Sequence, residues 1–379
     1  MKKILVIHNK YRYIGGEDIA VENEILFLKK NFDVETLYFS NDEATKRENI
    51  SALLFKKNKK SNQRLVNCIE EFRPDYVYVH NTWFNASLGI FEILDRYNIK
   101  TILKLHNFRY FCTRSFFSSK HFQGKDICNA CGAKNKRFKI FNKYYEDAFF
   151  KSIFISIYGK KYFKIIKNSN FKILVLTDFH KNFLKQLSIS DNRIQIFPNY
   201  LDIDSIKLEH PINTILYAGR ISEEKGIEEL INTFLSLDDL VMKLKIIGEG
   251  PMLQELKSKY QNSKIEFLGK LTNDEVLKEI SMSKAVVSAT KMYEGQPTLL
   301  CEASALGVPA IFPNTGGIVE FFPKNYKLSY EQFNYEDLRD KLQSINNQDS
   351  LNELGKENKD FIINKLDKDV LLDQFNKIL

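Results

Sequence analysis

The sequence predicts an α/β protein with two doubly wound parallel sheets, and two observations support this. Short apolar runs rich in β-branched and aromatic residues alternate with helical patterns in the first half of the chain, and the same alternation resumes in the second half. Such series form parallel sheets with right-handed crossovers. The length of 379 residues also favours two domains over one.

The first half supplies the elements of one such sheet. The predicted strands cover Ile4–Ile7, Val34–Phe39, Tyr76–Val79, Thr101–Leu105 and Lys172–Leu176. The predicted helices cover Glu17–Lys30, Ser61–Phe72 and Leu88–Tyr97. Residues 108–170 are the least regular part of this half. We expect the first domain to span residues 1–200.

The second half supplies the other sheet, after an expected linker at Leu201–Pro211. Its predicted strands cover Thr214–Ala218, Lys243–Ile247, Lys264–Leu268, Ala285–Ser288 and Ala310–Phe312. Its predicted helices cover Ile227–Ser236, Met252–Lys259, Asn273–Ser281, Thr298–Ala305 and Ile318–Phe322, and the tail Tyr335–Leu379 has a helical pattern. We expect the second domain to span residues 201–361, with a helix at 362–379 that packs back on the first.

Composition places the chain among globular proteins, with 44% hydrophobic and 27% charged residues. The net charge of +8 suits anionic partners but does not choose among them. No apolar stretch approaches the roughly 20 residues that cross a bilayer. Five cysteines, an odd number, favour a reducing compartment. We therefore expect a cytoplasmic protein.

Three predicted strands of the first half are followed by the same dipeptide, His8-Asn9, His80-Asn81 and His106-Asn107. Ligands of open α/β sheets bind at the carboxyl ends of the strands. Histidine and asparagine can also simply stop a strand and start a turn. Three polar pairs arriving at one edge together favour a binding crevice.

The second half places glycines and cations after its first two strands. Gly219 can bring backbone close to a ligand, and the Arg220 guanidinium can fork onto phosphate oxygens. Lys225-Gly226 opens the next helix, whose free N–H groups favour an anion. Gly248-Glu-Gly-Pro251 turns the chain after the following strand. The alternatives are solvated cations and ordinary strand-to-helix turns.

The run Glu294-Gly-Gln-Pro-Thr-Leu-Leu-Cys-Glu302 places two carboxylates eight positions apart. Pro297 fits the first position of a helix, and Gly307 fits the residue after its end. Glu302 can then accept hydrogen bonds from a vicinal diol, and Glu294 from sugar hydroxyls. The alternative is two exposed charges around a helix start, where acidic residues are favoured.

Two further features leave alternatives open. Paired glycines, Gly15-Gly16, precede a helix and can bring amides to phosphate. Cys112, Cys128 and Cys131 lie in one loop, and His121 or His106 could supply the fourth ligand that a structural zinc ion needs. Only half of the usual paired C-x-x-C signature is present, so the pattern favours reduced buried thiols or a loop ordered by an acceptor.

Cations and aromatics are mixed in Arg137–Tyr145 and Tyr158–Lys167. This pattern is typical of a surface that rests on an anionic membrane. It fits equally a helix that covers the first domain with its lysines in solvent. Nucleic acid is not expected, because no recognised binding module accompanies the charge.

Together these motifs resemble the retaining glycosyltransferases of family 4 (glycosyl transferases group 1), which have the GT-B fold of two Rossmann-like domains facing a cleft. The resemblance is nearly continuous in the second half, through Tyr217–Gly226, Gly248–Pro251, Phe267–Gly269, Glu294–Pro309 and Asn314–Gly317. The first half matches more loosely, through Gly15-Gly16, His80-Asn81, Leu105–Arg109, Cys112 and Pro198-Asn199.

The resemblance implies roles for particular residues. His106, Glu294, Arg220 and Lys225 would be catalytic. The implied donor-binding residues are Gly16, Gly219, Arg220, Lys225, Gly248, Gly250, Leu271, Glu294, Gly295, Gln296, Pro297, Thr298, Leu299 and Glu302. The implied acceptor-binding residues are His8, Gly15, Asn81, His106, Asn107 and Arg109. Gln296 stands where the family usually has an apolar residue, which puts the sugar preference in doubt.

The resemblance also implies a hexosyltransferase chemistry that needs no metal or other cofactor. The donor would be a UDP- or GDP-sugar and the acceptor a glycan, expected to be lipid-linked, in bacterial surface polysaccharide synthesis. The leaving diphosphate would take the acceptor proton. Two alternatives are a non-catalytic GT-B partner or acceptor-binding subunit and a sugar-nucleotide epimerase. The first should have lost its diphosphate contacts, and the Glu294–Glu302 motif disfavours the second.

Overall fold

A computed structural model describes residues 1–11, 15–41, 51, 58–113, 121–135, 149–202, 212–237, 242–345 and 348–379. The chain divides into two compact units. The first comprises residues 1–130, 134–200 and 368–379, and the second comprises residues 131–133 and 201–367. Each unit is built around a six-stranded sheet.

The first unit has a fully parallel sheet in the order β2-β1-β3-β4-β5-β6. Its strands are β1 (Lys3–Lys10), β2 (Asp33–Ser40), β3 (Tyr76–Val79), β4 (Lys100–Leu105), β5 (Lys172–Val175) and β6 (Ile194–Ile196). Its helices are α1 (Gly16–Lys29), α3 (Lys59–Phe72), α4 (Gly89–Arg96), α5 (Arg109–Cys112), α7 (Phe149–Asn168), α8 (Asp178–Gln186), the 3₁₀ turn η1 (Asp191–Arg193) and α15 (Lys368–Ile378).

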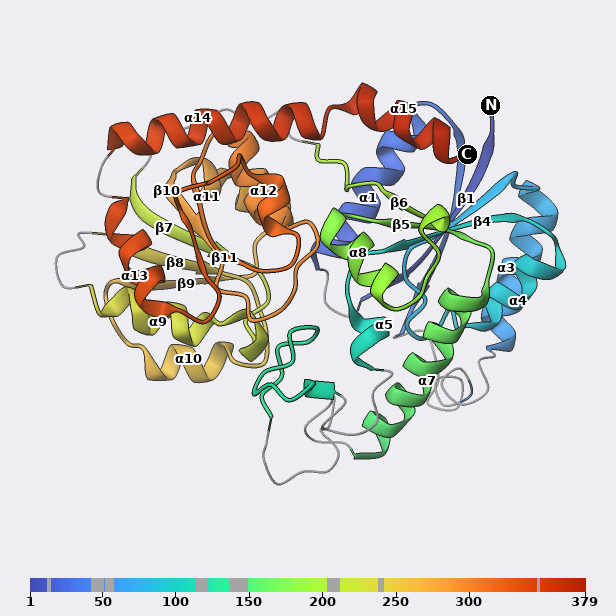
Figure 1. The fold of residues 1–379 in the computed structure, drawn as a ribbon, viewed down its shortest axis with the longest axis horizontal. Helices are drawn as coiled ribbons and strands as arrows, with labels where there is room; N and C mark the ends of the chain where they lie inside the picture. Colours follow the sequence, from blue (N-terminus) through green and yellow to red (C-terminus); the bar gives the residue numbers. More distant parts are fainter. Residues whose placement is uncertain are drawn as a thin grey trace. The chain divides into compact units, whose positions relative to one another are not determined.

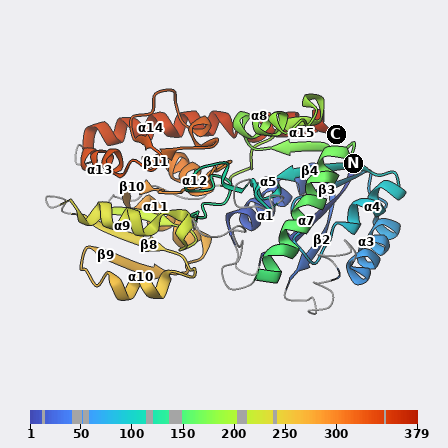
Figure 2. The same ribbon diagram turned by 60° about the horizontal axis from the view of Figure 1, so that its bottom comes forward.

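Alternate residues of β1 serve the two faces of this sheet, as the period of a strand requires. Ile4 and Val6 pack in one core with α1 and α15, whereas Leu5 and Ile7 pack in the other with α3, α4, α7 and α8. Helices α3 and α4 lie side by side (Figures 1 and 2). Phe375 anchors α15 against Tyr78 and Phe197, with ring centroids 5.5 and 5.3 Å away.

The second unit has a parallel sheet in the order β12-β11-β10-β7-β8-β9. Its strands are β7 (Ile212–Ala218), β8 (Lys243–Ile247), β9 (Ile265–Gly269), β10 (Ser283–Val287), β11 (Ala310–Asn314) and β12 (Ser329–Glu331). Its helices are η2 (Glu223–Lys225), α9 (Ile227–Leu235), α10 (Leu253–Lys259), α11 (Asn273–Ser281), α12 (Thr298–Leu306), η3 (Ile318–Phe321), α13 (Tyr335–Ser344) and α14 (Gln348–Lys365). Helix α13 packs on α9, and α14 packs on α12.

These sheets confirm the predicted pair of doubly wound parallel α/β units. Each predicted strand is present, but β6, β12 and α8 are additional. Strand β1 extends to Lys10, so His8 and Asn9 are residues of the strand rather than of the loop after it. Ile318–Phe321 is a 3₁₀ turn rather than an α-helix. Residues 203–211, most of the expected linker, lie outside the described residues.

Two helix starts differ from the sequence prediction. Pro297 is the N-cap of α12 rather than its first helical residue, and α10 begins at Leu253, two residues beyond Pro251. In both cases proline still ends the preceding loop, because its fixed φ suits the approach to a helix as well as the first turn. Gly307 ends α12 in the left-handed conformation, with φ of 80°, as predicted.

Helix α7 accounts for the second mixed basic and aromatic stretch. Tyr158, Tyr162 and Ile166, spaced four apart, are buried in the core of the first unit, while Lys160 and Lys164 are exposed. This is the helix that covers a domain with its lysines in solvent. The first stretch, Arg137–Tyr145, lies entirely outside the described residues. No described helix combines the length and apolar composition needed to cross a bilayer.

A buried ion pair connects α1 to β4 in the middle of the first sheet. Lys104 Nζ lies 2.7 Å from Glu24 Oε2, and both side chains are fully buried. Tyr78 Oη donates to the other carboxylate oxygen of Glu24 at 2.6 Å. The ammonium lies 4.7 Å from the centroid of the Phe197 ring. Burial lowers the pKa of Lys104, so the charged form depends on these partners.

We expect Lys104→Met to lower the free energy of unfolding by about 3–5 kcal/mol, because it leaves the Glu24 carboxylate buried without its cation. The double variant Glu24→Gln/Lys104→Met should recover much of that loss. Lys10→Met is the matched control, since the Lys10–Glu22 pair also tethers α1 but is 40% and 52% exposed; it should change stability by less than about 1 kcal/mol. Urea denaturation tests this, and equal losses for the two lysines would contradict it.

Candidate functional site

The carboxyl ends of β7 and β8 are joined by backbone contacts in the second unit. Gly219 N donates to Ile247 O at 3.0 Å, and Ile221 N donates to Glu249 O at 2.9 Å. A side chain at Gly248, which has φ of 133°, would place its Cβ 1.9 Å from Gly219 O. The glycines of these two loops therefore allow the two backbones to pack closely. We call the surface formed by the loops Gly219–Ile221 and Gly248–Gly250 the glycine rim.

An ion pair lies at the carboxyl end of the central strands. Lys225 Nζ is 2.6 Å from Glu294 Oε1, and the two side chains are 27% and 23% exposed. Thr290 Oγ1 donates to the same carboxylate oxygen at 3.0 Å. The backbone of Glu294 is fixed as well, because Gly317 N donates to its carbonyl at 2.8 Å. The structure thus brings together two predicted catalytic residues that are 69 positions apart.

Gly226 makes this pairing possible. It follows Lys225 with φ of 67°, in the left-handed region that favours glycine. A Cβ there would lie 2.1 Å from the carbonyl oxygen of Ala289, at the end of β10. Lys291 N donates a hydrogen bond to Glu224 O at 3.0 Å. The turn before α9 therefore packs closely against the loop after β10.

The predicted motif 294–302 forms the start of α12. Gly295 and Gln296 are buried, whereas Pro297, Thr298 and Leu299 are partly exposed. Glu302 lies more than one turn into the helix and is only 6% exposed. Burial raises the pKa of its carboxyl to about 7. Glu302 is therefore a buried carboxyl with a raised pKa, which disfavours the alternative of an exposed carboxylate.

Two other predicted residues stand at the same edge of the sheet. Arg220 is exposed and follows β7 by two residues. Leu271 is partly buried in the loop after β9 and packs against the core. An exposed guanidinium beside the glycine rim is suited to a phosphate.

Two of the predicted histidines of the first unit contact each other, with His80 buried and His106 partly buried. His80 Nδ1 lies 2.9 Å from His106 Nε2, and the rings stack with centroids 5.2 Å apart. Burial lowers the pKa of both imidazoles well below the usual range. His106 Nδ1 is buried without a hydrogen-bond partner in the described part of the chain. This ring nitrogen is therefore available for a hydrogen bond to a ligand.

His8 and Asn107 contact carboxylates that the sequence interpretation did not single out. His8 Nε2 lies 2.8 Å from Asp18 Oδ1, and both side chains are buried. Asn107 Nδ2 donates to Glu17 Oε2 at 3.1 Å. Both carboxylates belong to the first turn of α1, where they occupy the positive end of the helix dipole.

Those carboxylates change the interpretation of Gly15 and Gly16. Gly15 is the N-cap of α1, and its N–H already donates to Asp18 Oδ2 at 2.9 Å. An anion at this helix start would meet two acidic side chains in the first turn. The arrangement therefore disfavours phosphate at Gly15, although the Gly15-Gly16 role itself stays a prediction.

Asn81 and Arg109 contact the surrounding loop in different ways. Asn81 Nδ2 donates to Asn9 O at 2.8 Å, and its Oδ1 accepts from Trp83 N at 3.1 Å. Its amide therefore supports the loop. The Arg109 guanidinium lies over the Tyr11 and Trp83 rings, 5.4 and 5.3 Å from their centroids, which holds it beside the carboxyl end of β4.

The sequence interpretation missed Thr290, Lys291, Asp18 and Glu17. Lys291 is 2% exposed, and its ammonium lies 2.5 Å from Glu229 Oε1. Each missed residue follows a strand end or opens a helix, which is the only signal that the sequence offered for it.

We expect Gly226→Ala to destabilise the protein and to displace Lys225 from Glu294, because the new Cβ meets the Ala289 carbonyl. Gly269→Ala is the matched control: Gly269 has φ of 73°, but a Cβ there meets nothing within 4 Å. The control should cost only the roughly 1–2 kcal/mol of a left-handed alanine. Thermal denaturation of both variants tests this; an equal shift would show that the close approach at Gly226 contributes nothing.

We expect Glu302→Gln to stabilise the protein above neutral pH. The folded pKa of about 7 exceeds the ordinary value of 4.5, so ionisation destabilises the fold as pH rises from about 4.5 to 7, by about 3 kcal/mol in full. The variant should match wild type at pH 4.5 and exceed it at pH 8. Urea denaturation at both pH values measures this, with the exposed Glu255→Gln as control. A variant that is less stable at pH 8 would contradict it.

Parts of this chain are similar in sequence to known glycosyltransferases. Residues 202–364 match the family model described as Glycosyl transferases group 1. An uncharacterized glycosyltransferase of Methanocaldococcus jannaschii is 35% identical over 121 residues, which are 31% of each chain. The putative teichuronic acid biosynthesis glycosyltransferase TuaC of Bacillus subtilis is 33% identical over 113 residues, 30% of this chain and 28% of TuaC. The matched segments thus span about a third of these relatives.

Solved structures match the whole chain at low identity. Sucrose-phosphate synthase from Thermosynechococcus elongatus has a TM-score of 0.74 at 13% identity, covering 100% of this chain and 98% of that one. HepE of Anabaena, in complex with UDP and glucose, has a TM-score of 0.69 at 12% identity, covering 100% and 99%. The chain therefore has the GT-B fold and carries a Glycosyl transferases group 1 domain over residues 202–364.

Proposed function

We propose that this protein is a retaining glycosyltransferase of family 4, of the hexosyltransferase type. It moves a sugar from a UDP- or GDP-linked donor to a glycan acceptor. Three findings support the proposal: the Glycosyl transferases group 1 domain, relatives named for teichuronic acid and capsular polysaccharide biosynthesis, and a structural neighbour whose complex holds UDP and glucose.

The observation that carries the proposal is the Lys225–Glu294–Thr290 contact at the end of β7 and β10. In a doubly wound sheet this is the topological switch point, where ligands bind. Lys225 neutralises Glu294 at 2.6 Å while both remain partly exposed. An incoming diphosphate competes for the ammonium, and the released carboxylate accepts from sugar hydroxyls. In this proposal the ion pair supplies a cation for the diphosphate and a hydrogen-bond acceptor for the sugar.

The proposed chemistry is electrostatic. The bond from the sugar carbon to the diphosphate oxygen breaks, and the acceptor oxygen bonds to that carbon on the same face. The acceptor proton passes to the leaving diphosphate, so no side-chain nucleophile is needed. Arg220 and Lys225 stabilise the charge that develops on the leaving group, which is usually the largest catalytic contribution. Glu302 accepts from the ribose diol.

The first unit supplies the acceptor side of the proposal. His106 Nδ1 offers an unsatisfied nitrogen for a sugar hydroxyl, with His80 holding the ring from the other nitrogen. Both imidazoles are neutral at pH 7, because burial lowers the pKa of each. His106 is thus suited to hydrogen bonding rather than to supplying positive charge. Asn107 and Arg109, which follow on the same loop, are the other proposed acceptor contacts.

We further propose that the acceptor is lipid-linked and that the protein works in the cytoplasm at the inner face of an anionic membrane, during surface polysaccharide synthesis. The net charge of +8 and the exposed lysines of α7 support this setting. Binding to vesicles with and without anionic lipid distinguishes the membrane contact from a purely aqueous encounter.

We expect one UDP- or GDP-sugar to release its nucleoside diphosphate slowly in the absence of acceptor. Lys225→Met and Glu294→Gln should each lower that rate by about 10²–10³, because each removes charge stabilisation or sugar contact. Lys245→Met is the matched control, since Lys245 pairs with Glu279 at the same 2.6 Å in the same unit and is also partly buried. Its rate should stay at the wild-type value.

Calorimetry with the same donors separates the remaining outcomes. Binding without release would indicate an absolute need for acceptor, or the non-catalytic alternative, which adding acceptor resolves. No binding of any nucleotide sugar would overturn the proposed function.

A further inference from the structure

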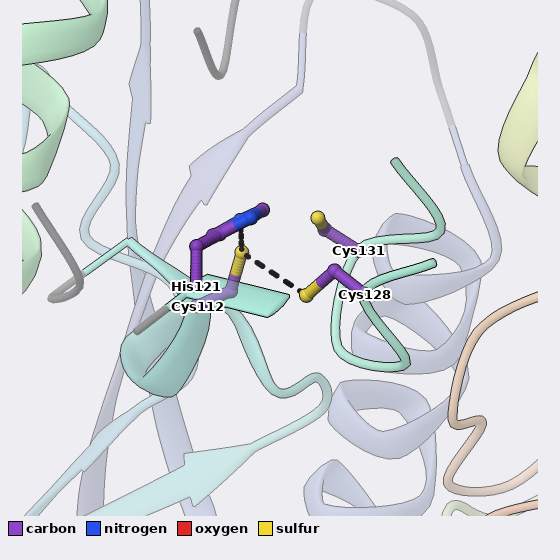
Figure 3. Close-up of side chains that lie close together, drawn as sticks. All are labelled: Cys112, His121, Cys128 and Cys131. Atoms are coloured by element: carbon purple, nitrogen blue, oxygen red, sulfur yellow. Dashed lines mark hydrogen bonds between the residues drawn. The ribbon is translucent and has the colours of Figure 1, made fainter. Parts of the chain in front are cut away.

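Four metal-binding side chains converge within one stretch of the chain, residues 112–131 (Figure 3). They are Cys112, His121, Cys128 and Cys131, whose ligand atoms all lie within 4.8 Å of one another. In Figure 3 the Cys112 sulfur lies between the His121 ring and the Cys128 sulfur, and Cys131 faces them. Three of the four are buried, and Cys131 is partly exposed.

The distances suit a tetrahedral ion better than a disulfide. Cys112 Sγ lies 4.0 Å from Cys128 Sγ, whereas a disulfide requires about 2.05 Å. Zinc bonds of about 2.3 Å to sulfur and 2.0–2.1 Å to nitrogen place two sulfurs about 3.8 Å apart and a sulfur and nitrogen about 3.5 Å apart. Cys112 Sγ and His121 Nε2, now 2.8 Å apart, need to separate by only a fraction of an ångström.

The backbone around Cys128 and Cys131 is a turn that aims both sulfurs the same way. An antiparallel bridge pairs Ile127 with Lys134, and Asn135 N donates to Asp126 O at 2.6 Å. Gly132 follows the second cysteine with φ of 70°, a conformation that favours glycine. The C-x-x-C-G sequence therefore closes a small knuckle, which is how structural zinc sites commonly present two of their ligands.

We propose that Cys112, His121, Cys128 and Cys131 bind one structural zinc ion. Three thiolates and an imidazole form a complete tetrahedral set, and this soft set selects zinc over magnesium or calcium. No ligand position is left for water or substrate, so the ion is structural. The inference rests on these four residues alone and does not depend on the proposed transferase activity.

The zinc would fix the loop that leaves the candidate acceptor edge. Cys112 ends α5, three residues after Arg109, and the knuckle lies sixteen residues further along. Thr113 Oγ1 donates back to Arg109 O at 2.6 Å. Metal binding would therefore tie Arg109 and α5 to the hairpin at 126–135.

The test uses the full-length wild-type chain, purified under reducing conditions with zinc in the medium. Elemental analysis should find about one zinc per chain. Replacement by cobalt should give the visible spectrum of a tetrahedral cobalt–thiolate site. Alkylation mapped by mass spectrometry should show Cys128 and Cys131 protected with metal and modified after chelation, whereas the partly exposed Cys68 reacts equally in both states.

Variants distinguish ligation from folding. Cys131→Ser and His121→Ala should lower the bound zinc by roughly tenfold or more after dialysis, because each breaks the four-ligand set. His121→Cys should retain zinc, since four thiolates also bind it. Cys68→Ser is the control and should retain the wild-type content.

The proposal is overturned if the reduced wild-type chain carries no zinc and gives no cobalt–thiolate spectrum. It is also overturned if mass spectrometry finds a Cys128–Cys131 disulfide in the freshly purified chain, or if Cys131→Ser and His121→Ala bind zinc as well as wild type does. The wild-type measurements decide the matter even where a variant fails to fold.

Discussion

The arrangement of parallel strands about the first strand of each unit is the constraint on which the rest depends. In the first unit β2 lies on one side of β1 and β3 on the other; in the second, β8 lies on one side of β7 and β10 on the other. Successive connections therefore leave in opposite directions and open a gap at the carboxyl ends. The loops that carry Gly219–Lys225 and Thr290–Glu302 meet there because of strand order, not because of their distance in sequence.

The two sheets use this same edge for different electrostatic environments. In the second unit the charged groups remain accessible: Arg220 is exposed and the Lys225–Glu294 pair is about a quarter exposed, so an anionic ligand can compete for the cations. In the first unit the histidines at this edge are more enclosed, because His8 and His80 are buried and His106 is partly buried. His80 and His106 are held neutral by burial, and His8 contacts Asp18 below the surface. Under the proposed function, the cations that compensate the donor's charge therefore lie in the second unit, whereas the histidines of the first unit offer neutral hydrogen-bonding groups.

The sequence predicted what depends on local pattern and missed what depends on pairing between distant segments. Tyr76–Val79 and Lys243–Ile247 were predicted with their observed bounds, because apolar runs between turn residues are local signals. Strands β6 and β12 have only three residues each, too few for any periodicity. The Glu24–Lys104 pair joins residues 80 positions apart, and a buried lysine looks like any other lysine in the sequence. The roles assigned to individual site residues stay predictions.

The cysteine loop is a second case in which contacts between separate segments could not be predicted from the sequence. From the sequence, a single C-x-x-C favoured reduced thiols over zinc, because only half of the usual paired C-x-x-C signature is present. Folding brings His121 to Cys112 and Cys112 to Cys128, which completes the set. A closed set of four protein ligands holds a metal without offering it to a diphosphate. A zinc-containing protein and metal-independent sugar transfer are therefore compatible, and loss of activity on chelation would report the order of the loop rather than the chemistry of the donor site.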